Sequence, residues 1–158
     1  MPTRVAVPEA TSAFQGEPVP RLNLARVGLG EGHSQAVVAD LRALAQQADS
    51  LGKKYISVVA STLMAQALIG NKDYAHARQE LQHNLSRSEK MGLRLQNAKI
   101  HYWLASTLRS AGTASEATPQ YREALRLLDE IRKEPGAEHI IERYDLKPMY
   151  AEATQFAQ

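Results

Sequence analysis

Glycines punctuate this chain at intervals that indicate a repeated unit. Gly52 and Gly92 are 40 residues apart, and Gly32 and Gly112 are 80 apart with Lys72 midway between them. Between these positions apolar and small residues recur every three or four residues, the period of an α-helix, and no stretch keeps the alternation of a strand. Glycine adopts the left-handed backbone of a helix C-terminus without steric cost, so these glycines mark joints between helices. The sequence therefore predicts an all-α chain.

A shift of the sequence by 40 residues places similar residues on one another. The aligned sets include Leu24, Met64 and Leu104, then Ala25, Ala65 and Ala105, and then Leu41, Leu81 and Tyr121. A fixed period of this size is typical of stacked helical repeats. We expect three helix pairs, at about residues 18–53, 54–93 and 94–134. The expected first helices are 19–31, 54–69 and 95–111, and the expected second helices are 34–51, 74–91 and 115–133.

The first unit departs from the pattern at two positions. Gly28 stands where the other units have Leu68 and Leu108, and Val37 stands where they have alanine.

Both ends of the chain lie outside the repeat. Residues 1–17 contain two prolines and no long periodic stretch, which predicts a flexible lead-in. Residues 135–158 follow the Pro135–Gly136 stop, and Pro148 suits the first turn of a last helix. A helical stack needs an element that covers its open apolar end, so we expect this segment to be a C-terminal cap, with a linker as the alternative. The apolar residues available for a cap are Ile140, Ile141, Met149, Tyr150 and Phe156.

Two of the units resemble the tetratricopeptide repeat (TPR) family. The segments LMAQALIGNKDYAHARQELQHNL and LASTLRSAGTASEATPQYREAL follow its order of large and small residues, with Tyr74 before Ala77 and Tyr121 before Ala124 as the more specific matches. The 40-residue period exceeds the family's 34 and is similar to arrays attached C-terminally to bacterial serine/threonine kinases, cyclases and transcription activators. The resemblance implies a right-handed α–α superhelix and a non-catalytic module that binds a protein or peptide, as part of a multidomain signalling protein.

Composition excludes several classes of function. The chain of 158 residues has no cysteine, and its 19 basic and 17 acidic residues leave a net charge of +2. The near balance of charges disfavours a nucleic-acid partner, and no apolar run has the length of a bilayer span. We therefore expect a cytoplasmic protein with neither nucleic acid nor membrane as its partner.

No motif for catalysis, a metal or a cofactor is recognisable. His76 and His83 lie seven residues apart, but no third ligand at a suitable spacing accompanies them. Gly28, Gly30 and Gly32 lack the preceding strand and the following Lys-Ser/Thr of a phosphate-binding loop. The sequence predicts no enzyme, no metal and no cofactor.

Recognition is the remaining function, and in a stack of helix pairs the first helices line the concave surface. The candidate peptide-binding residues are Arg26, Thr62, Gln66, Lys99, Tyr102, Ser106 and Arg109. Tyr102 would be an apolar anchor, and Arg26, Lys99 and Arg109 would select an acidic or carboxylate-bearing partner. Of the positions with which some TPR proteins hold a terminal carboxylate, only Lys99 matches, so such a clamp is not predicted. The alternative is a structural role, in which the array stacks on another copy of itself or on a neighbouring domain.

Overall fold

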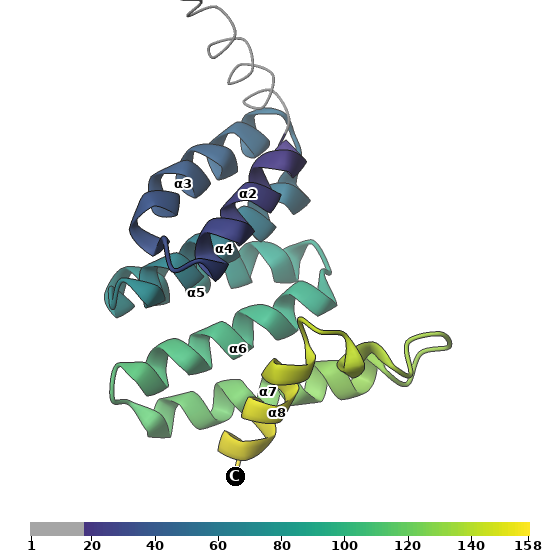
Figure 1. Ribbon diagram of the computed structural model, residues 1–158. Coiled ribbons are helices and arrows are strands. Elements are labelled where there is room, and N and C mark those ends of the chain that lie inside the picture. Colours follow the sequence, from purple (N-terminus) through teal and green to yellow (C-terminus); the bar gives the residue numbers. More distant parts are fainter. Residues whose placement is uncertain (1–17) are drawn as a thin grey trace, which may run out of the picture. The chain divides into compact units, whose positions relative to one another are not determined.

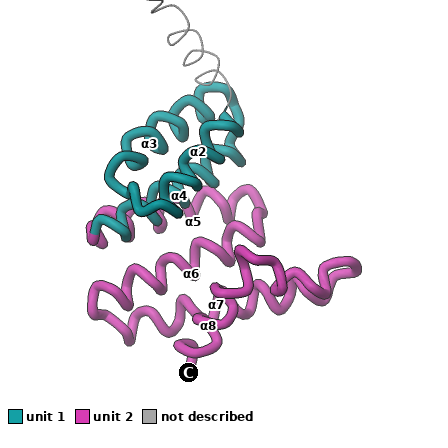
Figure 2. Tube along the Cα trace, in the orientation of Figure 1, with its two compact units in different colours: residues 1–71 teal, residues 72–158 magenta. Residues whose placement is uncertain are grey.

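The computed structural model describes residues 18–158, and all regular structure in that range is helical, which confirms the all-α prediction (Figure 1). The elements are α2 (Pro18–Gly30), α3 (Ser34–Ser50), α4 (Lys54–Gly70), α5 (Tyr74–Lys90), α6 (Arg94–Ser110), α7 (Ala114–Ile131), the 3₁₀ helix η1 (Ile140–Glu142) and α8 (Lys147–Phe156). The expected lead-in, residues 1–17, lies outside the described residues. The chain forms two compact units, residues 1–71 and 72–158 (Figure 2). None of the helices in residues 18–158 has the length and apolar character needed to cross a bilayer.

The helix boundaries follow the glycine spacing, and each predicted end agrees with the structure within two residues. Gly32, Gly52, Gly92 and Gly112 all have positive φ, between 68° and 88°. At Gly112 the backbone N–H donates to the Arg109 carbonyl oxygen at 3.1 Å. The helices α2, α3, α5 and α6 are therefore each followed by the left-handed glycine that the sequence predicts.

In the first unit, α3 packs against both α2 and α4. Its buried face carries Leu41, Leu44 and Ala48, each 1% exposed or less. The two residues that depart from the repeat pattern, Gly28 and Val37, lie against each other. A Cβ atom added to Gly28 would lie 2.7 Å from Val37 Cγ1. Val37 thus fills the space that a larger residue at position 28 would need.

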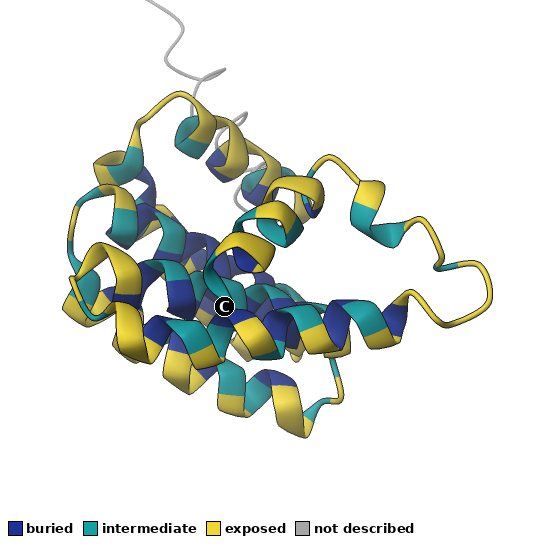
Figure 3. Cartoon of the chain, turned by 90° about the horizontal axis from the view of Figure 1, so that it is seen from below, coloured by how far each residue is buried: buried dark blue, intermediate teal, exposed yellow. Residues whose placement is uncertain are grey.

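In the second unit, α6 packs between α5 and α7, and α8 contacts both α7 and α6. Two apolar clusters lie there: Tyr121 with Leu108 and Ala153, and Leu146 with Leu128. The helices turn buried residues inward and exposed residues outward (Figure 3).

The connection that leads to the last helix, α8, is longer than the other connections between helices. Helices α2 to α7 are joined by three residues each, whereas residues 132–146 separate α7 from α8 and contain only η1. Part of this connection extends away from the helices and is exposed (Figure 3). Pro148 lies in the first turn of α8, as predicted. The five apolar residues suggested for a cap pack on the two clusters: Ile140, Ile141, Met149, Tyr150 and Phe156.

Candidate functional site

Three of the candidate peptide-binding residues belong to the first unit. Arg26 is exposed on α2, and its Nη1 donates to Asn23 Oδ1 at 3.1 Å. Thr62 is only 4% exposed on α4, and its hydroxyl donates to the Val58 carbonyl oxygen at 3.0 Å. Gln66 is half-buried on the same helix. Thr62 therefore presents little surface to a partner in this conformation.

The other four lie along α6 at spacings of three or four residues, which places them on one face of that helix. They are Lys99, Tyr102, Ser106 and Arg109. Arg109 is exposed and the other three are half-buried. We call Lys99, Tyr102 and Arg109 the α6 surface, because each of these three contacts the C-terminal segment of the chain.

The carboxylate of Glu152, on α8, receives hydrogen bonds from two residues of the α6 surface. The Tyr102 hydroxyl donates to Glu152 Oε2, and Arg109 Nη2 donates to Glu152 Oε1 at 2.7 Å. The Glu152 side chain is 23% exposed. A charged and a neutral donor thus hold the two oxygens of one partly buried carboxylate, the kind of hydrogen bond that is stronger than a neutral pair.

The same arginine also contacts an aromatic ring. Arg109 Cζ lies 4.0 Å from the centroid of the Phe156 ring, which is a cation–π geometry. The Phe156 ring in turn lies 5.9 Å from the ring of Tyr121, which is fully buried. Glu152 and Phe156 are one helical turn apart, so the Arg109 guanidinium contacts a carboxylate and a ring on one face of α8.

Lys99 binds a second carboxylate from the segment before α8. Its Nζ lies 3.1 Å from Asp145 Oδ2, and Arg143 also donates to Asp145 through Nε and Nη2 at 3.0 and 2.8 Å. Burial raises the pKa of Asp145, but the hydrogen bonds from Arg143 and Lys99 outweigh it and hold that pKa below its ordinary value. Asp145 is therefore an anion paired with two cations.

The tyrosines at this contact are stabilised in their neutral form. Burial, followed by the hydrogen bond to Glu152, raises the pKa of Tyr102 well above its ordinary value. Burial also raises the pKa of Tyr121. Tyr102 consequently remains a hydrogen-bond donor across the physiological pH range.

Helix α7 also holds α8. The Tyr150 hydroxyl donates to Asp129 Oδ1 at 2.9 Å, and Arg122 Nε donates to the Ala157 carbonyl oxygen at 2.6 Å. The second bond pairs a cation with a carbonyl at the C-terminal end of α8, where the helix dipole favours positive charge.

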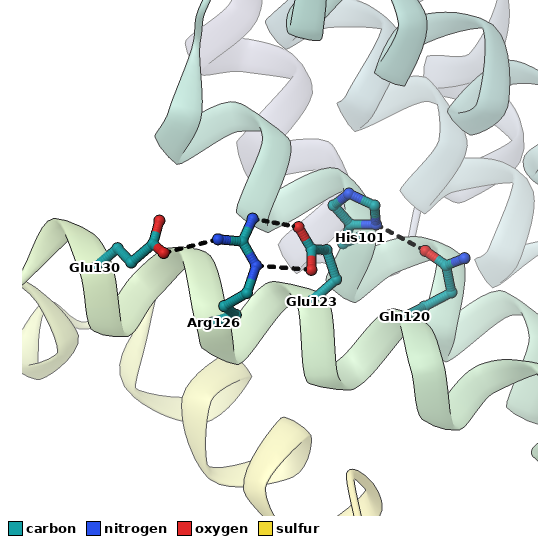
Figure 4. Close-up of polar contacts among 5 residues, drawn as sticks. All are labelled: His101, Gln120, Glu123, Arg126 and Glu130. Atoms are coloured by element: carbon teal, nitrogen blue, oxygen red, sulfur yellow. Dashed lines mark hydrogen bonds and ion pairs between the residues drawn. The ribbon is translucent and has the colours of Figure 1, made fainter.

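A second polar cluster runs along α7 (Figure 4). Arg126 pairs with Glu123 one turn before it and with Glu130 one turn after it, and His101 Nδ1 lies 2.7 Å from Gln120 Oε1. The hydrogen bond from Arg126 lowers the pKa of Glu123. Such i,i+3 and i,i+4 pairs stabilise an exposed helix face modestly.

Metal ligation has no support in the part of the chain that the structure describes. Residues 18–158 contain no group of three or more His, Asp or Glu side chains placed to hold an ion. His76 instead lies beside the carboxylate of Asp73, with Nδ1 2.7 Å from Asp73 Oδ2, at the first turn of α5.

The acidic partners of the α6 surface were missed by the sequence analysis. The expectation for residues 135–158 rested on their apolar side chains and gave no role to Asp145 or Glu152. A signal for Glu152 was present, since Glu152 and Phe156 share a face of the helix that Pro148 begins. Asp145 precedes that helix, so helical periodicity gave no sign of its contact with Lys99.

In comparisons with protein-family models, with curated proteins and with solved structures, nothing matches this chain.

Proposed function

We propose that this chain is a non-catalytic helical-repeat module, TPR-like in its pattern, that binds a protein or peptide through the α6 surface. The partner is an acidic segment, bound by its side-chain carboxylates and by an apolar or aromatic side chain beside them. A cytoplasmic location and a place in a multidomain bacterial signalling protein belong to the same proposal and rest on the sequence pattern alone.

One observation carries this proposal. Of the three cations that the sequence suggests for an acidic partner, Lys99 and Arg109 each contact a carboxylate within the chain itself, whereas Arg26 does not. Tyr102, suggested as an apolar anchor, also donates to one of these carboxylates. The spacing along α6 thus produces a surface that binds carboxylates in a folded helix. Arginine and tyrosine are also the residues that most often dominate the energy of protein interfaces.

The test uses a synthetic amphipathic helical peptide with glutamates along one face, and the same peptide with glutamines in their place. Fluorescence anisotropy with the full chain, at peptide concentrations up to the millimolar range, measures binding in competition with α8. We expect the glutamate peptide to bind and the glutamine peptide to bind much more weakly. The double change Lys99→Ala/Arg109→Ala should weaken binding on the order of tenfold, because it removes both cations of the surface.

The matched control removes two exposed arginines that pair with carboxylates elsewhere in the second unit. Arg78 pairs with Glu116, and Arg126 pairs with Glu123, so Arg78→Ala/Arg126→Ala removes the same charge. This control should bind the peptide as the unchanged protein does, and circular dichroism should show the same helix content in all variants. Equal binding by the Lys99→Ala/Arg109→Ala variant would overturn the proposed function.

Self-association is a second candidate, favoured by the exposed face of α2. Leu24 is 60% exposed, whereas its counterparts in the repeat, Met64 and Leu104, are each 3% exposed. Val19 and Val27 on the same helix are 54% and 56% exposed. This helix face is apolar, and the equivalent positions of the other two repeats are buried. Its exposure on α2 suits a contact with another copy of the chain.

Light scattering over a range of concentrations tests this candidate. A dimer that dissociates on the change Leu24→Gln/Val27→Gln supports it, with Tyr144→Gln as the control at a side chain that is 91% exposed in the other unit. A monomer at all concentrations excludes self-association under those conditions.

A further inference from the structure

Helix α8 presents to the α6 surface the chemistry that the proposed partner would present. Its Glu152 carboxylate and Phe156 ring are one turn apart, and both contact Arg109. Asp145, just before the helix, supplies a second carboxylate to Lys99. The C-terminal segment therefore neutralises both cations of the surface and covers the ring of Tyr121.

The attachment of α8 to the rest of the unit rests on few buried side chains. Within α8 only Ala153 is buried, and Leu146 is the one buried residue of the connection before it. The remaining contacts are half-buried apolar side chains, such as Met149 and Phe156, together with hydrogen bonds and ion pairs. Ion pairs at a surface are individually worth little. Releasing α8 should cost less than opening the pair α6 and α7, because these two helices supply four of the five buried residues of the shared cluster and α8 supplies only Ala153.

The connection permits release without unfolding a neighbouring helix. Residues 132–146 contain one three-residue helix and are mostly exposed. Release would leave the Lys99 and Arg109 side chains without their acidic partners, beside the rings of Tyr102 and Tyr121, which lose their contacts with Glu152 and Phe156. A surface of two cations and two aromatic rings fits an amphipathic helix with a carboxylate and an aromatic residue four positions later.

Resting on the proposed function, we infer that α8 is an intramolecular ligand that competes with the partner for the α6 surface. The partner is an acidic amphipathic helix of another protein with the carboxylate-to-aromatic spacing of Glu152 and Phe156. Since a tethered segment acts at an effective concentration in the millimolar range, the free surface is a minor state and the apparent affinity is reduced accordingly. Loosening α8 increases affinity without changing any residue of the binding surface.

The experiment uses a labelled peptide with the sequence of residues 143–158, RYDLKPMYAEATQFAQ, and the full chain as receptor. The receptor variant Glu152→Gln/Phe156→Ala weakens the tethered segment and leaves Lys99, Tyr102 and Arg109 intact. We expect it to bind the peptide about tenfold or more tightly than the unchanged chain, because a larger fraction of molecules has the surface free. Adding Arg109→Ala to this variant should abolish that gain, and a peptide with the Glu152→Gln/Phe156→Ala changes should bind weakly to every receptor.

The control receptor is Glu142→Gln, which removes an exposed carboxylate of the same tail that pairs with His139. It should bind the peptide as the unchanged chain does. If the double variant loses more helix signal by circular dichroism than the ten residues of α8 can account for, Glu152→Gln alone replaces it.

One contrary result is that the unchanged chain and the α8 variant bind the peptide with equal affinity and that Arg109→Ala abolishes binding to both. That result would overturn the inference that α8 competes for the surface and would leave the proposed function standing. Binding that persists in the Lys99→Ala/Arg109→Ala receptor would instead remove the proposed function. A dimer of the unchanged chain that dissociates on Glu152→Gln/Phe156→Ala would assign the surface to α8 of a second copy and would overturn a partner from another protein.

Discussion

Lys72 holds a backbone conformation that glycine holds at the equivalent joints. Its φ is 61°, whereas Gly32, Gly52, Gly92 and Gly112 occupy this conformation elsewhere. A side chain with a Cβ costs about 1–2 kcal/mol in the left-handed region. Lys72 is exposed, so its side chain gains little packing to offset that cost.

The change Lys72→Gly should therefore stabilise the chain. We expect the free energy of unfolding in urea to rise by about 0.5–1 kcal/mol, since the relief of backbone strain is partly offset by the greater freedom of glycine in the unfolded chain. The reverse change at an equivalent joint, Gly112→Ala, should lower it by about 1 kcal/mol, because no atom lies within 4 Å of the added methyl and only the backbone resists. A lower stability of the Lys72→Gly variant would contradict this reasoning.

The pair Gly28 and Val37 explains why the first unit departs from the repeat. The other units place leucine and alanine at these positions, and here the larger side chain lies on the opposite helix. The sequence showed both departures, but the 40-residue alignment compares each position only with its own counterparts. It could not show that one departure compensates the other, because that depends on the contact between α2 and α3.

A double-mutant cycle tests this compensation. Gly28→Ala should destabilise the protein, because the new methyl lies 2.7 Å from Val37 Cγ1. Val37→Ala should also destabilise it, by about 2 kcal/mol, because it leaves a cavity. In the double variant the methyl enters that cavity, so the summed losses should exceed the observed loss by about 1 kcal/mol, as measured by urea unfolding.

Gly30→Ala is the control, since nothing lies within 4 Å of a methyl at that position of α2. It should leave stability unchanged or slightly higher, as alanine favours a helix over glycine. Strict additivity of the two single changes would show that Gly28 and Val37 do not compensate each other.

At the scale of the element, each helix from α3 to α7 was predictable because its signal is local. Apolar periodicity and the glycine that follows each helix lie within about 20 residues of one another, and every predicted boundary is confirmed within two residues. The face of α6 that carries Lys99, Tyr102 and Arg109 was predictable for the same reason. The partners of this face were not, because Glu152 lies 43 residues beyond Arg109 and joins it only through tertiary folding.

The docking of α8 should be visible in the ionisation of tyrosine at high pH. Burial and the carboxylate of Glu152 raise the pKa of Tyr102, and burial and Asp129 raise the pKa of Tyr150. A tyrosine whose pKa is raised by folding contributes to the free energy of unfolding at a pH below its ordinary pKa of 10. That contribution is lost as the pH rises toward the pKa of the folded state. We expect these hydroxyls to ionise only above pH 10, together with a loss of helix signal.

Phenolate absorbance and circular dichroism, recorded on the same alkaline titration, measure the two events. Tyr102→Phe should reduce the delayed absorbance step and move the loss of helix signal, because it removes the hydroxyl that donates to Glu152. Complete ionisation of all six tyrosines near pH 10 with the helices intact would contradict the contacts described for α8.

For the whole molecule, paired carboxylates in residues 72–158 contribute to the dependence of stability on acid pH. Hydrogen bonds from His76 lower the pKa of Asp73, those from Arg126 lower that of Glu123, and backbone N–H groups lower that of Glu138. At Asp145 burial acts in the opposite direction and is outweighed by Arg143 and Lys99. A carboxyl pKa lowered by folding contributes stability that is present above its unfolded value and is lost as the pH falls through its folded value.

The urea midpoint of the full chain should therefore decline as the pH falls below about 5, where the unfolded chain begins to bind more protons than the folded one. His139 has the opposite sign, because Glu142 raises its pKa, and its contribution is complete before this range is reached. High salt screens exposed ion pairs, so it should reduce their contribution to the fall of the urea midpoint. The contribution of Asp145 should persist more, because its side chain is only 25% exposed. Asp145→Asn should remove that salt-resistant part, and an unchanged pH slope in this variant would show that the pairing with Lys99 does not hold the C-terminal segment in place.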